Sequence, residues 1–205
     1  MAQARKKRAN GEASRQRILD AAAEIAGERG YEGTSINLVS ERSGLPASSI
    51  YWHFRDKDEL IAAVIDRSFR QWSETLERPV AVPEGATGED VLRAGLRRTG
   101  EALAQFPDFL RLGLMLILER RPEEPTARSR FIDTRHVTSA RVADLYRAYF
   151  GDLDEQAIRS LTTLTMALAD GLFVASEIDE IALDDAFDLV ATAVLGAARQ
   201  LGHRR

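Results

Sequence analysis

The 205-residue sequence contains 44% hydrophobic and 29% charged residues, values that are ordinary for a soluble globular protein. It has no cysteine, which excludes disulfides, thiolate zinc sites and cysteine nucleophiles; it also shows neither a secretory signal nor the ~18–20 apolar residues of a membrane span. The formal net charge of −4 is uneven, because residues 1–57 hold ten Lys and Arg against seven Asp and Glu, a net of +3, and the remainder therefore carries −7.

A basic beginning on an acidic chain is typical of a protein that contacts nucleic acid at one end. A disordered, solubilising tail explains the same charge equally well. The basic run Arg5–Arg8 lies in the segment 1–13, which we expect to be a disordered basic arm. The absence of cysteine and of a secretory signal predicts a cytoplasmic location.

The next part of the chain is predicted to form short helices separated by glycine and proline. Serine, threonine and aspartate favour helix N-caps, proline favours the first turn, and glycine favours the residue after a helix. On these signals Ser14 caps the first helix, Thr34 or Ser35 the second, and Asp56 the fourth, while Pro46 starts the third. The predicted helices span residues 14–30, 36–43, 46–53 and 56–77.

Apolar residues continue with helical spacing through the rest of the chain, and no strand is predicted. Thr87 and Asp90 form a capping pair, Pro107 opens a short apolar helix, and Asp152 with Glu155 caps the penultimate helix. A long helix is predicted between about residues 126 and 150, and the last helix begins near residue 184. The residues of the long helix that we expect to face inward are Phe131, Val142, Leu145 and Tyr149.

The last two helices are apolar on two sides, and such helices must cover two surfaces. Their second stripes are formed by Met166, Ala169 and Phe173 in one helix and by Leu189, Ala193 and Gly196 in the other. One partner is the chain's own bundle. The other is either the same helix pair of a second subunit, in an isologous four-helix interface, or the interior of a monomer; the pattern favours the dimer.

Residues 36–53 have the pattern of a helix-turn-helix, with two short helices, a glycine in the turn and an apolar anchor beside it. The outward side chains of the second helix are then Ala47, Ser48, Ser49, Tyr51, Trp52 and His53. Small residues let a helix approach base edges, aromatic residues offer contact area and hydrogen-bond donors, and His53 with Lys57 can contact phosphates. A surface helix whose aromatic residues pack on the body is the alternative.

Residues 14–60 resemble the DNA-binding head of the TetR-type transcriptional regulators. The family pattern is roughly Gly-aromatic-x-x-Thr-Ser/Thr, followed by Gly-Val/Leu-x-x-x-x-Leu/Ile-Tyr-x-His/Tyr-Phe-x-x-Lys-x-x-Leu. The chain matches it in register with Gly30-Tyr31, Thr34-Ser35, Gly44-Leu45, Ile50-Tyr51-Trp52-His53-Phe54, Lys57 and Leu60. It departs at Pro46 and Ser48, where Ser or Thr and Gly are frequent, and at Ser40 and Ser43, where alanine is common.

The resemblance implies an all-α protein with a three-helix DNA-binding head, residues 14–60, and a helical bundle for effector binding and dimerisation, residues 61–205. Base contacts are implied for Ala47, Ser48 and Tyr51. Phosphate contacts are implied for Thr34, Ser35, Ser49, Trp52, His53 and Lys57. Arg5–Arg8 would reach an adjacent minor groove or form a tail that does not bind. The expected protein is a bacterial repressor that binds a palindromic operator as a homodimer and is released by a small-molecule effector.

Candidate effector-pocket residues are polar groups on otherwise apolar helices, together with large side chains that could wall a cavity. They are Trp72, Phe109, Met115, Thr162, Thr165, Met166, Asp170 and Phe173. Asp170 would bind a cationic ligand, pair with Arg111, Arg120 or Arg135, or face solvent. The threonines are expected to hydrogen-bond to their own helix.

No enzyme is predicted, because the three histidines are far apart in sequence and no phosphate-binding glycine loop, nucleophile elbow or metal signature is visible. No cofactor and no membrane partner are expected. The rival from another class is a helical small-molecule-binding or scaffold protein whose head no longer binds DNA. The presence of Tyr51, His53 and Lys57 favours the regulator.

Overall fold

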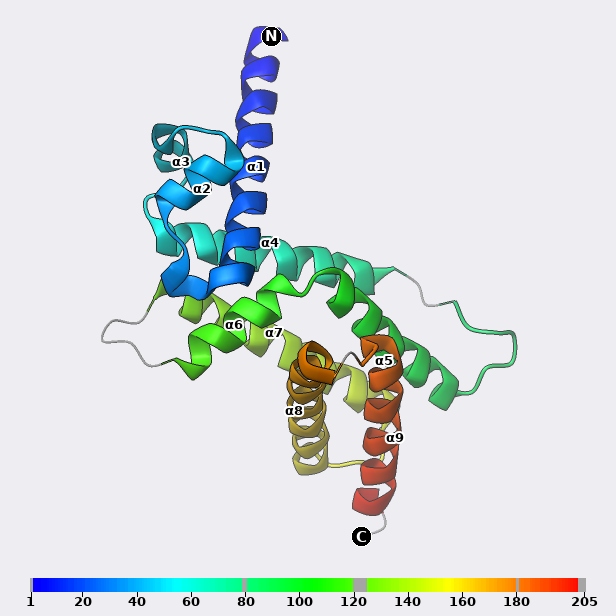
Figure 1. The fold of residues 1–205 in the computed structure, drawn as a ribbon. Helices are drawn as coiled ribbons and strands as arrows, with labels where there is room; N and C mark the ends of the chain where they lie inside the picture. Colours follow the sequence, from blue (N-terminus) through cyan, green and yellow to red (C-terminus); the bar gives the residue numbers. More distant parts are fainter. Residues whose placement is uncertain (1, 79–80, 120–124, 180, 203–205) are drawn as a thin grey trace. The chain divides into compact units, whose positions relative to one another are not determined.

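The computed structural model describes residues 2–78, 81–119, 125–179 and 181–202, with side chains from residue 9 onwards. Within these ranges all regular structure is helical and no strand occurs, which confirms the predicted all-α class (Figure 1). Arg120 and the side chains of Arg5–Arg8 lie outside the described residues. In chain order the helices are α1 (Ala2–Gly33), α2 (Ile36–Ser43), α3 (Ala47–His53), α4 (Lys57–Glu77), α5 (Gly88–Gln105), α6 (Asp108–Leu118), α7 (Thr126–Tyr149), α8 (Glu155–Asp179) and α9 (Leu183–Gly202).

The chain forms two compact units. Unit 1 comprises Met1–Arg70 and Pro107–Asp133, and unit 2 comprises Gln71–Phe106 and Thr134–Arg205. Helices α4 and α7 each begin in unit 1 and end in unit 2, whereas α6 belongs to unit 1. These units differ in extent from the functional division at residue 60, which stays a prediction about function.

Helix α1 supplies the apolar face on which unit 1 is built, and α2, α3 and α6 contact it. The largest fully buried side chains of this unit are Ile18, Leu19, Ile25, Ile50, Leu60, Ile61, Ile65, Leu112, Leu116 and Phe131. Gly113 of α6 permits an unusually close approach, because a Cβ there would lie 2.1 Å from the ring of Phe131. A larger residue at this position would have to displace that ring.

Helix α1 differs from the prediction at its beginning. It starts at Ala2, so residues 2–13, which were expected to be disordered, are helical. Ser14 does not cap the helix; its Oγ donates to the Asn10 carbonyl oxygen at 2.9 Å inside it. Alanine, glutamine, arginine and lysine are good helix formers, so residues 2–13 favour a helix despite their high charge, on which the expectation of disorder rested. Gly30, the expected end, has a φ of 69° that breaks the helical path.

Polar contacts fasten the beginning of α4 to the beginning of α7. The two carboxylate oxygens of Asp58 accept hydrogen bonds from the backbone amides of Thr126 and Ala127 at 2.6 and 3.0 Å. These amides have no carbonyl partner within their own helix, so Asp58 acts as a cap for α7. Further along, Asp66 pairs with Arg130 at 3.4 Å, although burial raises the pKa of the Asp66 carboxyl.

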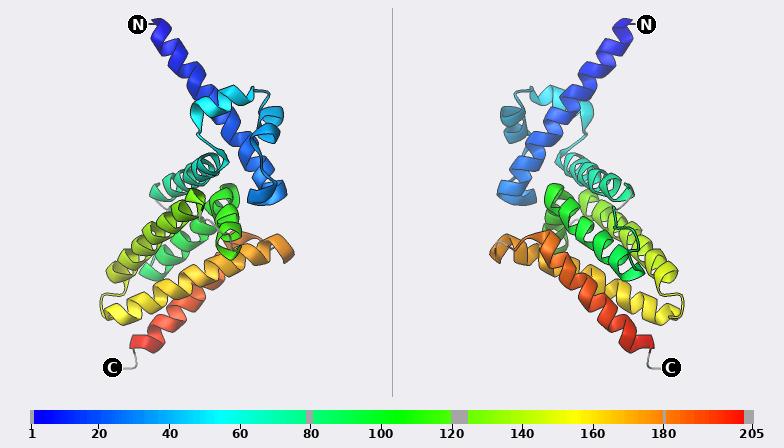
Figure 2. Two further views of the ribbon diagram at one scale, coloured as in Figure 1. Left: turned by 90° about the vertical axis from the view of Figure 1, so that its left-hand side faces the viewer. Right: turned by 90° about the vertical axis from the view of Figure 1, so that its right-hand side faces the viewer.

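Helix α9 is the centre of unit 2, and α5 and α8 lie along it (Figures 1 and 2). Its first turns carry Asp184, Asp185 and Asp188, which lie 3.0–3.4 Å from the guanidinium of Arg97 on α5. Acidic residues are favoured near a helix N-terminus, and Arg97 also counters their mutual repulsion. The pairing therefore fixes α5 against the beginning of α9.

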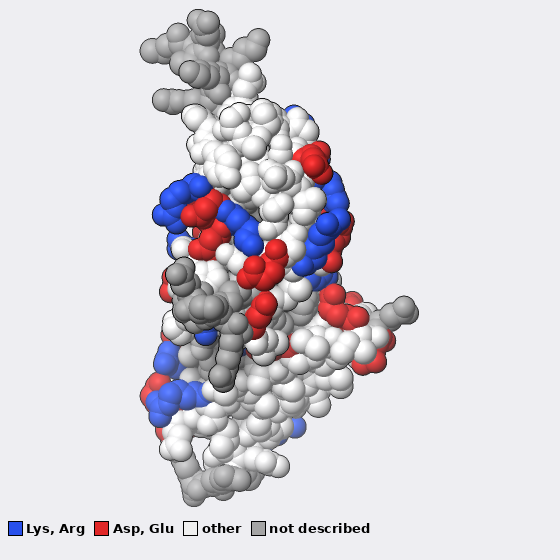
Figure 3. Space-filling view, turned by 60° about the vertical axis from the view of Figure 1, so that its left-hand side comes forward, with Lys and Arg blue, Asp and Glu red and all other residues white. Residues whose placement is uncertain are grey.

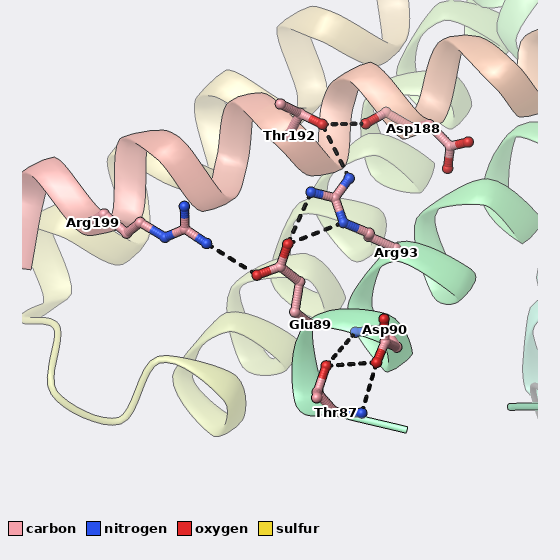
Figure 4. Close-up of polar contacts among 7 residues, drawn as sticks. All are labelled: Thr87, Glu89, Asp90, Arg93, Asp188, Thr192 and Arg199. Atoms are coloured by element: carbon pink, nitrogen blue, oxygen red, sulfur yellow. Dashed lines mark hydrogen bonds and ion pairs between the residues drawn. The ribbon is translucent and has the colours of Figure 1, made fainter. Parts of the chain in front are cut away.

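A second polar set joins α5 to the later part of α9 (Figure 4). Arg93 donates to Glu89 at 2.9 Å and to the Thr192 hydroxyl at 3.0 Å. Arg199 donates to the other Glu89 oxygen at 3.0 Å. The predicted capping pair, Thr87 and Asp90, is confirmed at the start of α5. The polar residues of this face thus bind one another.

The cap of α8 and the inner face of α7 differ from the prediction. Asp154 rather than Asp152 caps α8, because its Oδ1 accepts from the amide of Ala157 at 2.9 Å. In α7, Leu145 is exposed and its neighbour Tyr146 is fully buried, with its hydroxyl 2.6 Å from Thr165 Oγ1. The sequence of α7 itself has polar residues on most sides of the helix, so the spacing of its apolar residues did not identify the buried face.

Helix α8 is long and apolar enough, by length and composition, to cross a membrane. A helix of a soluble protein passes the same test when its apolar side chains are covered, so the finding is weak evidence for a membrane. Only 22% of its most apolar window is buried within the chain. Much of the surface of this window is therefore accessible in the single chain.

Candidate nucleic-acid interface

Helices α2 and α3 form the helix-turn-helix that the sequence predicts. Ser35 caps α2, with its Oγ accepting from the amide of Leu38 at 3.3 Å, and Gly44 ends the helix with a φ of 65°. Pro46 precedes α3 in an extended conformation, and the amide of Ser49 donates to its carbonyl at 2.8 Å. Ile50 is the fully buried residue of α3 and holds the helix on the head core.

Helix α3 leaves its large aromatic side chains exposed. Tyr51 is 57% and Trp52 75% accessible, and Ser48 is exposed as well. Ala47 and Ser49 are half-buried. Exposing two large aromatic residues on a seven-residue helix gives up the free energy of burying them, so the arrangement is typical of a contact surface. The alternative of aromatic residues packed on the body is not what the structure shows.

Trp52 and His53 continue this surface towards α1. A Cβ on Gly11 would lie 3.8 Å from the Trp52 ring, and the rings of Trp52 and His53 meet edge to face with centroids 4.6 Å apart. Burial, followed by the charge of Arg15, holds the pKa of His53 below its ordinary value of 6.5. His53 is therefore neutral near pH 7 and can donate one hydrogen bond, and a nearby phosphate would favour its cationic form.

Two predicted phosphate ligands are engaged inside the head. Thr34 is 2% exposed, and its Oγ1 donates to the Gly30 carbonyl at 2.8 Å, so it stabilises the turn between α1 and α2. A phosphate contact from Thr34 stays a prediction. Lys57 Nζ donates to the Tyr31 carbonyl at 3.1 Å and lies 4.3 Å from the centroid of that ring. A phosphate contact from Lys57 stays a prediction. To make it, the ammonium group would have to give up its hydrogen bond to the Tyr31 carbonyl.

Three residues that the sequence did not single out as site residues contact the turn between α2 and α3. Arg17 Nη2 donates to the Ser43 carbonyl at 2.6 Å, and Ser40 Oγ donates to the Leu45 carbonyl at 2.7 Å. Ser43 Oγ accepts from the Leu45 amide at 3.3 Å. The only available signal was that Ser40 and Ser43 depart from the alanines common in the resembling pattern; Arg17 was counted merely as charge.

Charged groups of both signs are interspersed on the face that Figure 3 shows. In the head, Arg42 illustrates the pattern, because its guanidinium binds Glu24 at 2.9 Å and Glu28 at 3.1 Å. Arg42 is therefore engaged by acidic residues of the head rather than available to a phosphate. Attraction to phosphates must come from the remaining cations and from backbone and hydroxyl donors.

The predicted effector-pocket residues fall into two sets. Phe109 and Met115 belong to unit 1, where Phe109 is buried and Met115 is exposed. The other six belong to unit 2: Trp72, Thr162, Thr165, Met166, Asp170 and Phe173. Thr162 and Thr165 donate to the carbonyls of Ile158 and Leu161, which confirms the expected bonding to their own helix. Membership of a pocket stays a prediction for all eight.

Asp170 pairs with Arg135, and an arginine partner was one of the three alternatives that the sequence left open for it. Two hydrogen bonds of 2.6 and 2.7 Å join the guanidinium to both carboxylate oxygens. About a quarter of each side chain remains accessible, 29% for Arg135 and 26% for Asp170. A cationic ligand would have to displace this bidentate partner, so the structure favours the ion pair over a free anionic site.

The fold and the exposed recognition helix define a helix-turn-helix protein, and comparison with known proteins agrees. Residues 18–64 match the model described as bacterial regulatory proteins, tetR family. The chain is 37% identical over 62 residues to the HTH-type transcriptional regulator SrpR of Pseudomonas putida, which is 30% of this chain and 29% of SrpR. It is 34% identical over 65 residues to AcrR of Shigella flexneri, 32% of this chain and 30% of AcrR.

A third match is the HTH-type transcriptional repressor Rv1353c of Mycobacterium tuberculosis, 32% identical over 68 residues, 33% of this chain and 26% of that protein. The chain thus matches less than a third of the length of each of these relatives. Each match spans about a third of this chain, and the family model places its own match at residues 18–64.

Solved structures extend the likeness to most of the chain. A TetR-like transcriptional regulator from Rhodococcus sp. RHA1 has a TM-score of 0.68 at 20% identity, covering 89% of this chain and 93% of that one. The fatty acid degradation regulator FadR from Bacillus halodurans has a TM-score of 0.69 at 16% identity, covering 88% and 94%. At such identity these structures show the fold alone. The family model thus matches the head, and the solved structures extend the likeness in fold to most of the chain.

Proposed function

We propose that the chain is a DNA-binding transcriptional regulator that reads an operator with α3. The observation that carries this proposal is the exposure of Tyr51 and Trp52 on a short helix that follows a left-handed glycine turn. Ala47, Ser48 and Tyr51 are assigned to base edges. Ser35, Ser49, Trp52, His53 and Lys57 are assigned to phosphates. Repression is the proposed mode, in keeping with the name of the similar repressor Rv1353c.

The proposed regulator acts as a homodimer through α8 and α9. These helices pack on each other, and each exposes a stripe of small and apolar residues: Ala167, Gly171, Val174 and Ile178 on α8, and Leu189, Ala193 and Gly196 on α9. No atom lies within 4 Å of a Cβ built on Gly171 or Gly196, so both glycines offer room for a partner helix. The predicted α8 stripe is corrected, because Phe173 is buried and Gly171 and Val174 face outward.

Effector release is the remaining element of the proposal. A ligand that binds the body changes DNA affinity only if it binds two conformations of the protein with different affinity. Helices α4 and α7 both begin in unit 1 and end in unit 2. A conformational change in unit 2 is therefore proposed to reach unit 1 through these two helices. The ligand is proposed to lie among the body helices near Trp72, Thr162, Thr165, Met166 and Phe173.

The DNA-binding proposal is tested by selecting duplexes from a random pool with the full chain. We expect enrichment of a palindromic sequence, bound by two recognition helices about one helical turn or a multiple apart. Affinity for that duplex should fall steeply with salt, with a slope of about −0.9 per neutralised phosphate. No enrichment by a folded protein, or salt-insensitive binding, would contradict the proposal.

The dimer is tested by light scattering on the wild type and two variants. Leu189→Arg places a charge on the proposed interface, whereas Val91→Arg places one on an exposed apolar residue of α5 as a matched control. We expect dimers for the wild type and Val91→Arg and a monomer for Leu189→Arg, because an unpaired charge is costly to bury. A wild type that is monomeric at micromolar concentration would rule out the interface.

A further inference from the structure

The turn between α2 and α3 is held by more hydrogen bonds than its backbone alone can make. The left-handed Gly44 ends α2, and Pro46 has no amide to donate. Carbonyls at a helix end have no partner within the helix and must find one elsewhere. Here Arg17 donates to the Ser43 carbonyl and Ser40 to the Leu45 carbonyl, so both carbonyls are satisfied by side chains of the head.

Ser43 completes this set from the inside. Its side chain is 7% exposed, and its Oγ accepts from the Leu45 amide at 3.3 Å and donates to the Ser40 carbonyl at 3.4 Å. A buried hydroxyl with bonds in both directions constrains the turn, because breaking either bond leaves a desolvated polar group. The backbone amide of Leu45 is therefore bound by Ser43, and its carbonyl is bound by Ser40.

The bonds to the turn affect the orientation of α3. Glycine in a turn has a large conformational entropy, so a turn that contains one is not rigid by itself. Packing holds α3 through the buried side chains of Ile50 and, at its end, Phe54, and bonds to the turn add resistance to rotation of the helix. The bonds from α1 through Arg17 and from α2 through Ser40 and Ser43 oppose it.

We propose that Arg17, Ser40 and Ser43 form a brace that orients the recognition helix and sharpens its discrimination between DNA sequences. They are positioning residues and need not touch DNA. Base contacts demand an accurate helix position, whereas attraction to phosphates tolerates a range of positions. Loss of the brace therefore weakens binding to the selected sequence more than binding to other DNA. This inference rests on the proposed function.

The test uses the full-length protein with four serine variants. Ser40→Ala and Ser43→Ala each remove one hydroxyl of the brace, and Ser40→Thr keeps the hydroxyl. Ser160→Ala is the matched control, because the exposed Ser160 of α8 belongs to unit 2 and its Oγ donates to the Gln156 carbonyl at 2.9 Å. Thermal melting followed by circular dichroism verifies that each variant is folded.

Two quantities are measured. The first is hydrogen exchange of the Leu45 amide and of the α3 amides in the protein without DNA. The second is the ratio of the dissociation constants for a scrambled duplex and for the duplex that the wild type selects from a random pool. For Ser40→Ala and Ser43→Ala we expect exchange to accelerate and the ratio to fall, each about fivefold, the change that corresponds to one hydrogen bond. Ser40→Thr and Ser160→Ala should match the wild type.

The outcomes separate the brace from the proposed function. If the wild type selects a sequence and the alanine variants keep its ratio, or lose affinity equally for both duplexes, the brace does not act in recognition and the inference is overturned. If the wild type selects no duplex, the proposed function fails, and the role of the brace in recognition fails with it. In that case the exchange measurement still shows whether the serines hold the turn.

Discussion

The recognition helix and the body treat their polar and aromatic side chains in opposite ways. In α3, Tyr51 and Trp52 stand exposed, and one buried residue, Ile50, holds the helix. In unit 2, by contrast, Arg97 binds three aspartates of α9 and Arg135 binds both oxygens of Asp170. A large aromatic side chain that is left exposed indicates a contact surface, whereas a charged side chain that is paired with another one mainly stabilises the fold. The exposed side chains of α3 therefore point to a contact surface on the head, whereas the paired groups of unit 2 identify no ligand.

The sharpest way to break this comparison is to remove the inward residue of α3. Ile50→Ala deletes a fully buried side chain, so we expect a loss of about 2–5 kcal/mol in the free energy of unfolding. Denaturation in urea measures it. Leu145→Ala, an exposed leucine on α7, is the control and should change stability little. An Ile50→Ala protein as stable as the wild type would mean that α3 is not anchored as described.

The neighbouring outward residue should behave in the opposite way. Tyr51→Ala is expected to weaken binding to the selected duplex by about 1–3 kcal/mol while stability is unchanged, because the side chain contacts little of the protein. Fluorescence anisotropy titration measures the affinity, and thermal melting verifies the fold. Wild-type affinity in a folded Tyr51→Ala protein would remove the base assignment of this residue.

In the body, a paired residue should affect stability and leave DNA binding intact. Arg135→Met breaks the bidentate pair with Asp170 while keeping the aliphatic part of the side chain. Because both groups are partly exposed, we expect a loss of only about 1 kcal/mol in unfolding free energy. Affinity for the selected duplex without effector should be unchanged. A large loss of DNA affinity would show that this pair acts beyond the body.

The smallest effect concerns pH. Burial, and then Arg15, lowers the pKa of His53 in the folded protein below the 6.5 of the unfolded chain. Between these two values the unfolded state binds more protons, so this contribution to stability is complete above 6.5 and is lost as pH falls through the folded pKa. His53→Gln should therefore flatten the dependence of unfolding free energy on pH in this range, measured by urea titrations. An unchanged slope would contradict the assignment.

The sequence predicted those features that depend on local chemistry. Ser35, Gly44, Pro46 and Asp56 mark helix boundaries through their own backbone preferences, and their helices lie where they were expected. The helix-turn-helix pattern of residues 36–53 predicted the outward direction of Tyr51, which its exposure confirms.

Features that depend on distant partners were missed. The burial of Thr34 and the choice of Tyr146 over Leu145 follow from tertiary packing that no spacing rule contains. The brace on the turn was missed for a related reason. Arg17 reaches Ser43 across 26 positions, so its role exists only once α1 and α2 have packed together.

The cap that Asp58 places on α7 limits where the molecule can be divided. A fragment comprising residues 61–205 would retain the proposed body and lose this carboxylate, leaving the amides of Thr126 and Ala127 without their acceptor. The start of a helix in the second half of the chain would then fray for want of a residue from the first. A truncation at the proposed functional boundary would therefore remove a contact on which the fold of the second half depends. An isolated body would need a replacement N-cap for α7 in its own sequence.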